Sequence, residues 1–114
     1  MNLNDFLKKL NDTPGSIDFT NTIGVIDALY DFTPSTFQNG EQLNAAGQNN
    51  GSCKLFSFAK LHNLSKEQTL HCFGNYYRDV LNTPTATDHA NIRNFMKYGW
   101  DGIEFDGTPL KLKA

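Results

Sequence analysis

Apolar residues recur at helical spacing along most of the chain, and this pattern predicts five helices. The expected helices span residues 4–11, 19–30, 53–62, 66–81 and 89–98. In the second, Phe19, Ile23, Ile26 and Tyr30 fall on one helical face. This periodicity favours a mainly α architecture.

Capping residues mark several of the expected helix ends. Asp18 and Ser52 precede the second and third helices and are expected to be their N-caps. Ser65, with Gln68 three residues later, forms a capping box for the fourth helix. Gly99 stands where a C-cap glycine would end the fifth.

The third expected helix is apolar over most of its circumference. Its polar residues Lys54, Ser57 and Lys60 are spaced three apart and form one narrow stripe. A helix with so wide an apolar surface is typical of the interior of a domain. We therefore expect residues 53–62 to form the central helix.

Two segments have turn or strand patterns. Residues 31–51 are rich in Gly and Asn and contain Pro34, and such long irregular segments are often functional. A short strand could precede the Asn39-Gly40 turn, and alternation at residues 103–105 suits another strand or a hairpin. The expected fold is one compact α+β domain over residues 1–114, with about five helices and a short C-terminal β-hairpin or strand pair.

Composition and charge exclude several classes of protein. The 114 residues are 39% hydrophobic and 12% aromatic, as in a globular domain. The net charge is −2 and the basic residues are scattered, so nucleic acid is not expected as a partner. No apolar run approaches the roughly 20 residues of a membrane span. The oligomeric state is left open.

The two cysteines, Cys53 and Cys72, are expected to be free thiols in a reducing compartment. There is no Cys-x-x-Cys motif, and the three histidines form no tight pair. We therefore expect no metal site and no cofactor.

Cys53 is the candidate nucleophile. With Ser52 as N-cap it would occupy the first helical position, where the helix dipole lowers a thiol pKa. His89 is the best candidate base. The alternative interpretation is that Cys53 is a small buried residue, because free cysteine is among the most buried types.

Four residues are candidates for ligand binding. Arg78 and Arg93 could converge on a phosphate or carboxylate, or could instead pair with neighbouring acids. Trp100 could stack on a ligand or cover the edge of the core. Asn49, in the amide-rich loop with Asn44, could contact a polar ligand or hydrogen-bond the irregular backbone.

Four long segments carry a family resemblance. TPSTFQNG (33–40), GQNNGSCKLFSFAKL (47–61), FGNYYRDVL (73–81) and DHANIRNFMKYGWDGIEF (88–105) together resemble the HopJ type III effector family. The resemblance covers residues 18–110. It implies a bacterial effector-like protein, located in the bacterial cytoplasm or delivered into a host cell by type III secretion, and it brings no catalytic residues.

A second resemblance is local. GSCKLFSFA and DHA are similar to the cysteine and histidine segments of papain-like cysteine hydrolases, which are far longer. Two hypotheses follow. The first is a small protein that acts by binding a protein or small polar ligand, and the alternative is a hydrolase or transferase using Cys53 with His89.

Overall fold

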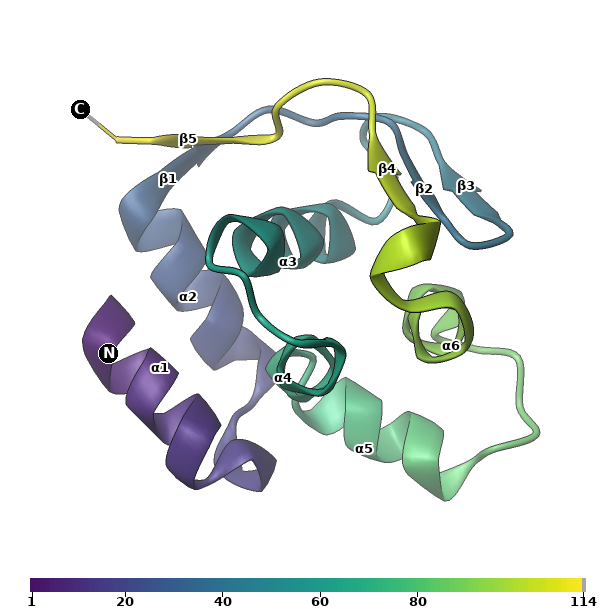
Figure 1. The fold of residues 1–114 in the computed structure, drawn as a ribbon, viewed down its shortest axis with the longest axis horizontal. Helices are drawn as coiled ribbons and strands as arrows, with labels where there is room; N and C mark the ends of the chain where they lie inside the picture. Colours follow the sequence, from purple (N-terminus) through teal and green to yellow (C-terminus); the bar gives the residue numbers. More distant parts are fainter. Residues whose placement is uncertain (114) are drawn as a thin grey trace.

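The computed structural model describes residues 1–113 and contains six α-helices and five short strands within that range (Figure 1). The helices are α1 (Leu3–Asp12), α2 (Phe19–Leu29), α3 (Asn50–Leu61), α4 (Lys66–Cys72), α5 (Asn75–Asn82) and α6 (Ala90–Tyr98). The strands are β1 (Tyr30–Phe32), β2 (Phe37–Asn39), β3 (Gln42–Asn44), β4 (Ile103–Phe105) and β5 (Leu110–Leu112). Two 3-10 turns are η1 (Pro14–Ser16) and η2 (Gly99–Gly102). The expected mainly helical α+β class is confirmed.

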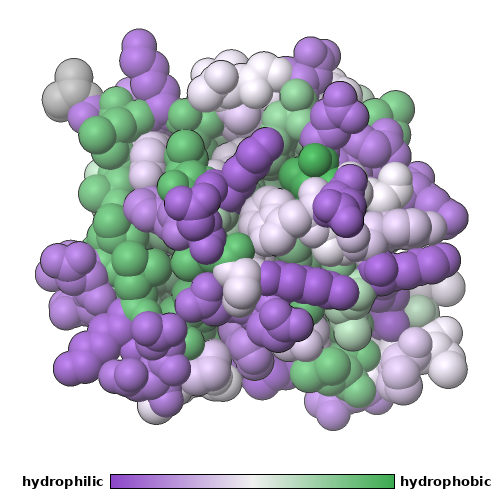
Figure 2. Space-filling view, in the orientation of Figure 1, coloured by the Kyte–Doolittle hydropathy of each residue, from purple (hydrophilic) through white to green (hydrophobic). Residues whose placement is uncertain are grey.

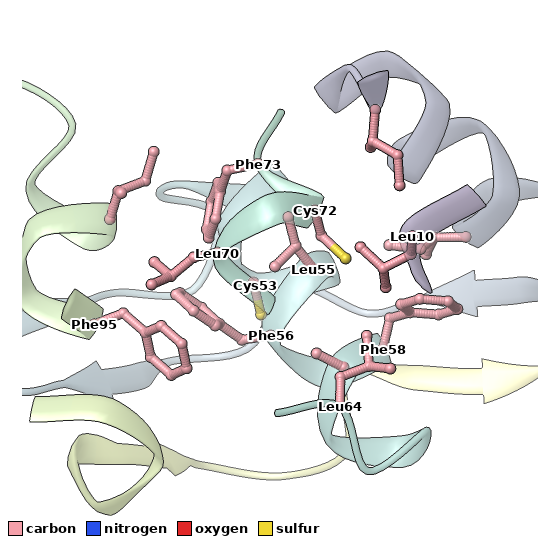
Figure 3. Packing of buried hydrophobic residues seen from close by; sticks show 14 of the residues in the cluster. Leu10, Cys53, Leu55, Phe56, Phe58, Leu64, Leu70, Cys72, Phe73 and Phe95 are labelled. Atoms are coloured by element: carbon pink, nitrogen blue, oxygen red, sulfur yellow. The ribbon is translucent and has the colours of Figure 1, made fainter. Parts of the chain in front are cut away.

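Helix α3 is the centre of the core, as its sequence predicts. Phe56 is fully buried, and its ring centroid lies 5.0 Å from that of Phe95 and 5.4 Å from that of Phe73. On another side of the helix, Phe58 meets Phe6 of α1 edge to face at 5.9 Å. Figure 3 shows these rings converging from several elements. The other helices therefore pack around α3 because it has apolar side chains to bury in nearly every direction.

The strands form one interrupted antiparallel ribbon over α3. Strand β1 pairs with β5 (Tyr30↔Leu112) and β2 pairs with β4 (Phe37↔Phe105). From the first pair to the second, the position moves forward by seven residues in one strand and back by seven in the other, so both strand pairs have the same register. Strand β3 adds to β2 as a hairpin across a turn that begins at Gly40, as the Asn-Gly signal predicts.

The pairing of the last two strands corrects one expectation. Strands β4 and β5 do not form a C-terminal hairpin with each other, because each pairs with an earlier strand. Residues 106–109 arch between them, and Pro109 accepts a backbone hydrogen bond from Thr33 at 2.8 Å. Figure 1 shows this arch above α3.

Glycine 74 divides the expected helix 66–81 into α4 and α5. Gly74 has φ 57° and ψ −121°, a conformation that no α-helix contains. A Cβ there would lie 2.6 Å from the Asp18 Cα and the Ile17 carbonyl oxygen. Close packing against residues 17–19 thus ends α4, so the structure has six helices and not five.

Two helix starts also differ from expectation. Helix α3 begins at Asn50, three residues before the expected start, and its N-cap is Asn49 with φ 53°. Ser52 therefore lies inside the helix, and the Cys53 N–H already donates to the Asn49 carbonyl at 3.0 Å. Helix α6 begins at Ala90, with His89 as N-cap at φ 52°. Asp18 as N-cap and the Ser65–Gln68 capping box are confirmed.

Hydrophobic groups also gather on part of the surface. Figure 2 shows them on the left flank, over α2 and the β1–β5 pair, whereas the rest of this face is mixed. The most exposed large side chains include Leu61 and Leu112, at 54% and 66% exposure.

Replacing Gly74 with alanine should destabilise the protein by about 2–4 kcal/mol, because both the positive φ and the close backbone contact disfavour a Cβ. Gly24→Ala is the matched control. Gly24 lies inside α2 with open space around it, so this change should stabilise by up to about 1 kcal/mol. Urea unfolding measures both, and equal effects at the two sites would contradict the packing role of Gly74.

Candidate functional site

A cavity of about 500 Å³ lies where helices α3 and α6 begin. The first turns of these helices line it together with the start of α2 and the α4–α5 junction. Its lining residues are Phe19, Asn49, Gly51, Ser52, Phe73, Tyr76, His89, Ala90, Asn91 and Ile92. None of these side chains carries a permanent charge.

Four rings form the aromatic wall of the cavity. Phe19 stacks on Phe73 with centroids 6.1 Å apart, and Tyr76 lies 5.2 Å from Phe19. The ring of Tyr76 is in turn 5.3 Å from that of His89. The Phe19 ring can pack this closely on α3 because residue 51 is glycine, where a Cβ would come within 2.8 Å of the ring.

The polar wall of the cavity consists of the two helix starts. The first N–H groups of a helix have no acceptor within the helix. Those of Asn50, Gly51 and Ser52 in α3, and of Ala90 and Asn91 in α6, have no hydrogen-bond acceptor among residues 1–113. Neither N-cap side chain accepts a capping bond from its helix. The polar wall thus offers hydrogen-bond donors and a partial positive charge.

A cluster of asparagines holds the two helix starts against the β2–β3 hairpin. Asn44 accepts from Asn49 at 2.7 Å and from Asn91 at 2.9 Å. Asn39 donates to the Asn91 carbonyl at 2.8 Å. Asn39 and Asn44 are fully buried, and the Asn39 Oδ1 atom has no partner among residues 1–113. The cluster fixes the position of the cavity because it links three separate elements.

Cys53 and His89 are not brought together. The Cys53 thiol is 1% exposed, is absent from the cavity lining, and lies 3.8 Å from the Ser35 carbonyl oxygen. Burial raises its pKa, which disfavours the thiolate. His89 instead lines the cavity beside Tyr76, with its Nε2 atom 3.8 Å from an Asp88 carboxylate oxygen. Figure 3 shows the sulfur atom among packed apolar side chains. This geometry gives no support to thiol catalysis.

Both arginines that were candidates for ligand binding instead bind carbonyl and carboxylate groups of this chain. Arg78 donates to the carbonyls of Gly15 and Ile17 and pairs with Asp18 at 2.7 Å. Arg93 makes analogous contacts within the loop before α6, pairing with Asp88 at 2.8 Å. The two guanidinium groups hold separate loops and do not converge on one site. Each pairs with a neighbouring acid, which is the second of the two expectations.

Trp100 packs in the core, whereas Asn49 lines the cavity. The Trp100 indole N–H donates to the Leu64 carbonyl at 3.0 Å, and its ring packs on Phe56 and Phe95. Asn49 lines the cavity, as does His89. Sequence reasoning missed Phe19 and Tyr76, because no local pattern shows that these rings meet beside the start of α3.

Two further observations bound the chemistry of the described residues. Within residues 1–113, no three His, Cys, Asp or Glu side chains lie close enough together to hold a metal ion. None of the helices in that range has both the length and the apolar character needed to cross a bilayer.

The asparagine cluster leads to a prediction of stability. Asn44→Leu should cost about 2–4 kcal/mol, because the amide of buried Asn91 and the amide of Asn49 both lose their acceptor. Asn4→Leu, at an exposed position on α1, should change the free energy of unfolding little. Chemical denaturation tests this, and equal losses would contradict the role of the cluster.

Burial of Cys72 predicts a pH dependence. Burial raises the pKa of this thiol to about 12. Above about pH 8.5 the unfolded thiol ionises while the folded one stays protonated, so stability should fall by about 1.4 kcal/mol per pH unit from this group. Unfolding measured at about pH 8 and about pH 10 should show a shallower fall in a Cys72→Ala variant. Equal slopes would show that Cys72 is not buried in this way.

Comparisons with known proteins agree with this fold. A family model described as HopJ type III effector protein matches residues 3–110. A crystal structure of a protein of unknown function, VPA0580, superposes with a TM-score of 0.96 and is 52% identical over 99% of this chain and 95% of that chain. No curated protein matches the chain. The family match spans nearly the whole sequence, and the chain belongs to the HopJ type III effector protein family.

Proposed function

We propose that this protein is a binding module whose cavity holds a small ligand with a flat apolar body and a hydrogen-bond-accepting end, such as a carboxylate. The observation that carries this proposal is that the aromatic wall and the polar wall line the same cavity. The volume of about 500 Å³ falls within the range usual for small-molecule sites.

The aromatic wall supports a flat apolar body. Phe19, Tyr76 and His89 follow one another at centroid distances near 5 Å, and Tyr76 is 39% exposed. A ring of a ligand could cover this wall by offset or edge-to-face contact, which is worth about 0.5–1.5 kcal/mol beyond its buried area.

The polar wall supports an acceptor at the other end of the ligand. Free N–H groups at a helix start bind anions readily, and the helix dipole adds about half a positive charge. Two helix starts face this cavity, with the N–H groups of Ser52 and Asn91 among those without acceptors. No Asp or Glu lines the cavity, and the Asp88 carboxylate beside His89 is paired with Arg93 at 2.8 Å.

The family assignment adds a proposed place of action. The matching family model is described by the words type III effector protein, and delivery from the bacterial cytoplasm into a host cell is part of this proposal. Secretion of a tagged chain by a strain with the secretion system, and its retention by a strain without it, tests that part. Equal retention in both strains would contradict delivery.

Benzoate and benzylamine provide a direct test of the cavity. In an ¹H–¹⁵N NMR titration, benzoate should shift the amides of Gly51, Ser52 and Ala90 with saturation, and benzylamine should not, because its charge has the wrong sign. Tyr76→Ala should weaken benzoate binding by about tenfold through loss of the aromatic wall.

Tyr77→Ala is the matched control for this titration. Tyr77 neighbours Tyr76 but packs against His71 outside the cavity lining, so its loss should leave benzoate binding unchanged in a folded variant. Equal shifts with benzylamine, or no effect of Tyr76→Ala, would contradict the proposed site.

A further inference from the structure

Strand β4 has a free edge. It lies at the end of the strand order β3–β2–β4. The Gly40 N–H donates to the Gly102 carbonyl, and the Asp106 N–H donates to the Thr36 carbonyl, each at 2.9 Å. Since backbone groups in an antiparallel strand alternate in direction, the N–H and C=O of Phe105 point away from β2. They are available to another strand.

A hollow of about 530 Å³ lies beside β4 and extends to α3. Ile103 and Phe105 line it from the strand, and both are half-buried. Lys60 and Leu61 line it from the last turn of α3, and both are exposed. The hollow thus combines unused backbone groups with apolar and charged side chains, as peptide grooves at sheet edges do.

The two charges beside this edge are of opposite sign. The Lys60 ammonium group lies 5.7 Å from the Phe105 ring centroid. Among residues 1–113, neither Lys60 nor Glu104 has an oppositely charged group within 4.0 Å. Because side chains alternate along a strand, Glu104 points to the face opposite to Phe105. Each face of the edge therefore offers one charge.

We propose that the β4 edge binds an extended peptide segment of a partner protein whose charges are complementary to these two. An acidic side chain of the peptide would face Lys60, and the next residue, on the other face, would be basic and lie opposite Glu104. Apolar neighbours of the acidic residue would pack on Leu61 and Phe105. The peptide backbone would pair with the free groups of Phe105.

The bend after β4 favours a short peptide over a second copy of the chain. Gly107 has φ 113°, and Pro109 lacks an N–H, so regular pairing stops soon after Asp106. Lys111 in β5 and Lys113 just after it add like charges, a feature that opposes edge-to-edge association. An edge three residues long suits a segment held partly by its side chains.

Blocked heptapeptides test this inference with the whole chain. The parent peptide alternates valine and threonine. In each member of the first set, glutamate replaces one valine and lysine replaces the threonine that follows it. The members differ in where along the peptide this pair is placed. A mirror set exchanges the glutamate and the lysine. A member of the first set should slow amide hydrogen exchange at Phe105 by about tenfold at saturation. It should bind about three- to tenfold more tightly than its mirror.

Charge reversal gives the sharper arm of the experiment. A Lys60→Glu/Glu104→Lys double variant should prefer the mirror set, whereas Lys8→Glu, an exposed position on α1, should keep the preference of the unmodified chain. The proposal is overturned if no peptide protects Phe105, if the double variant keeps its original preference, or if Phe105 is protected by self-association without peptide. This test is independent of the cavity at the helix starts.

Discussion

Burial of α3 determines where the other helices and strands pack. A helix with Cys53, Leu55, Phe56, Phe58 and Ala59 all removed from water needs cover on nearly every side. Helices α1, α2, α4 and α6 supply most of this cover, and the β ribbon closes the remaining side (Figure 1). The ribbon crosses the whole helix. Its two halves, the β1–β5 pair and the β2–β4 pair, have the same register, although residues 106–109 arch between them.

The same constraint explains why the cavity lies at a helix start. Side-chain packing can cover the flanks of α3, but its first N–H groups point along the axis and need acceptors. Asn49 turns the chain into the helix and bonds Asn44 instead of capping it. The asparagine cluster then places the start of α6 beside the start of α3. Two donor-rich ends share one space, closed by Phe19 and Tyr76.

Local patterns in the sequence predict local structure here and little beyond it. The Ser65–Gln68 capping box, the C-cap Gly99 and the buried third helix are confirmed because each depends on neighbouring residues. The break at Gly74 depends on residues 17–19, and the partners of β4 and β5 are also far away in the sequence. The cavity could not be predicted for the same reason. The cysteine motif is a local pattern, whereas the rings of the aromatic wall come together only in the folded chain.

The aromatic wall and the polar wall at the starts of α3 and α6 together make the proposed ligand site. Soaking crystals of the protein with a mixed set of small aromatic acids, amines and alcohols tests it most directly. We expect electron density for acids in this cavity, with the ring against Tyr76 and the carboxylate against the N–H groups of residues 50–52 or 90–91. An empty cavity with fragments bound elsewhere, or amines bound there as readily as acids, would contradict it.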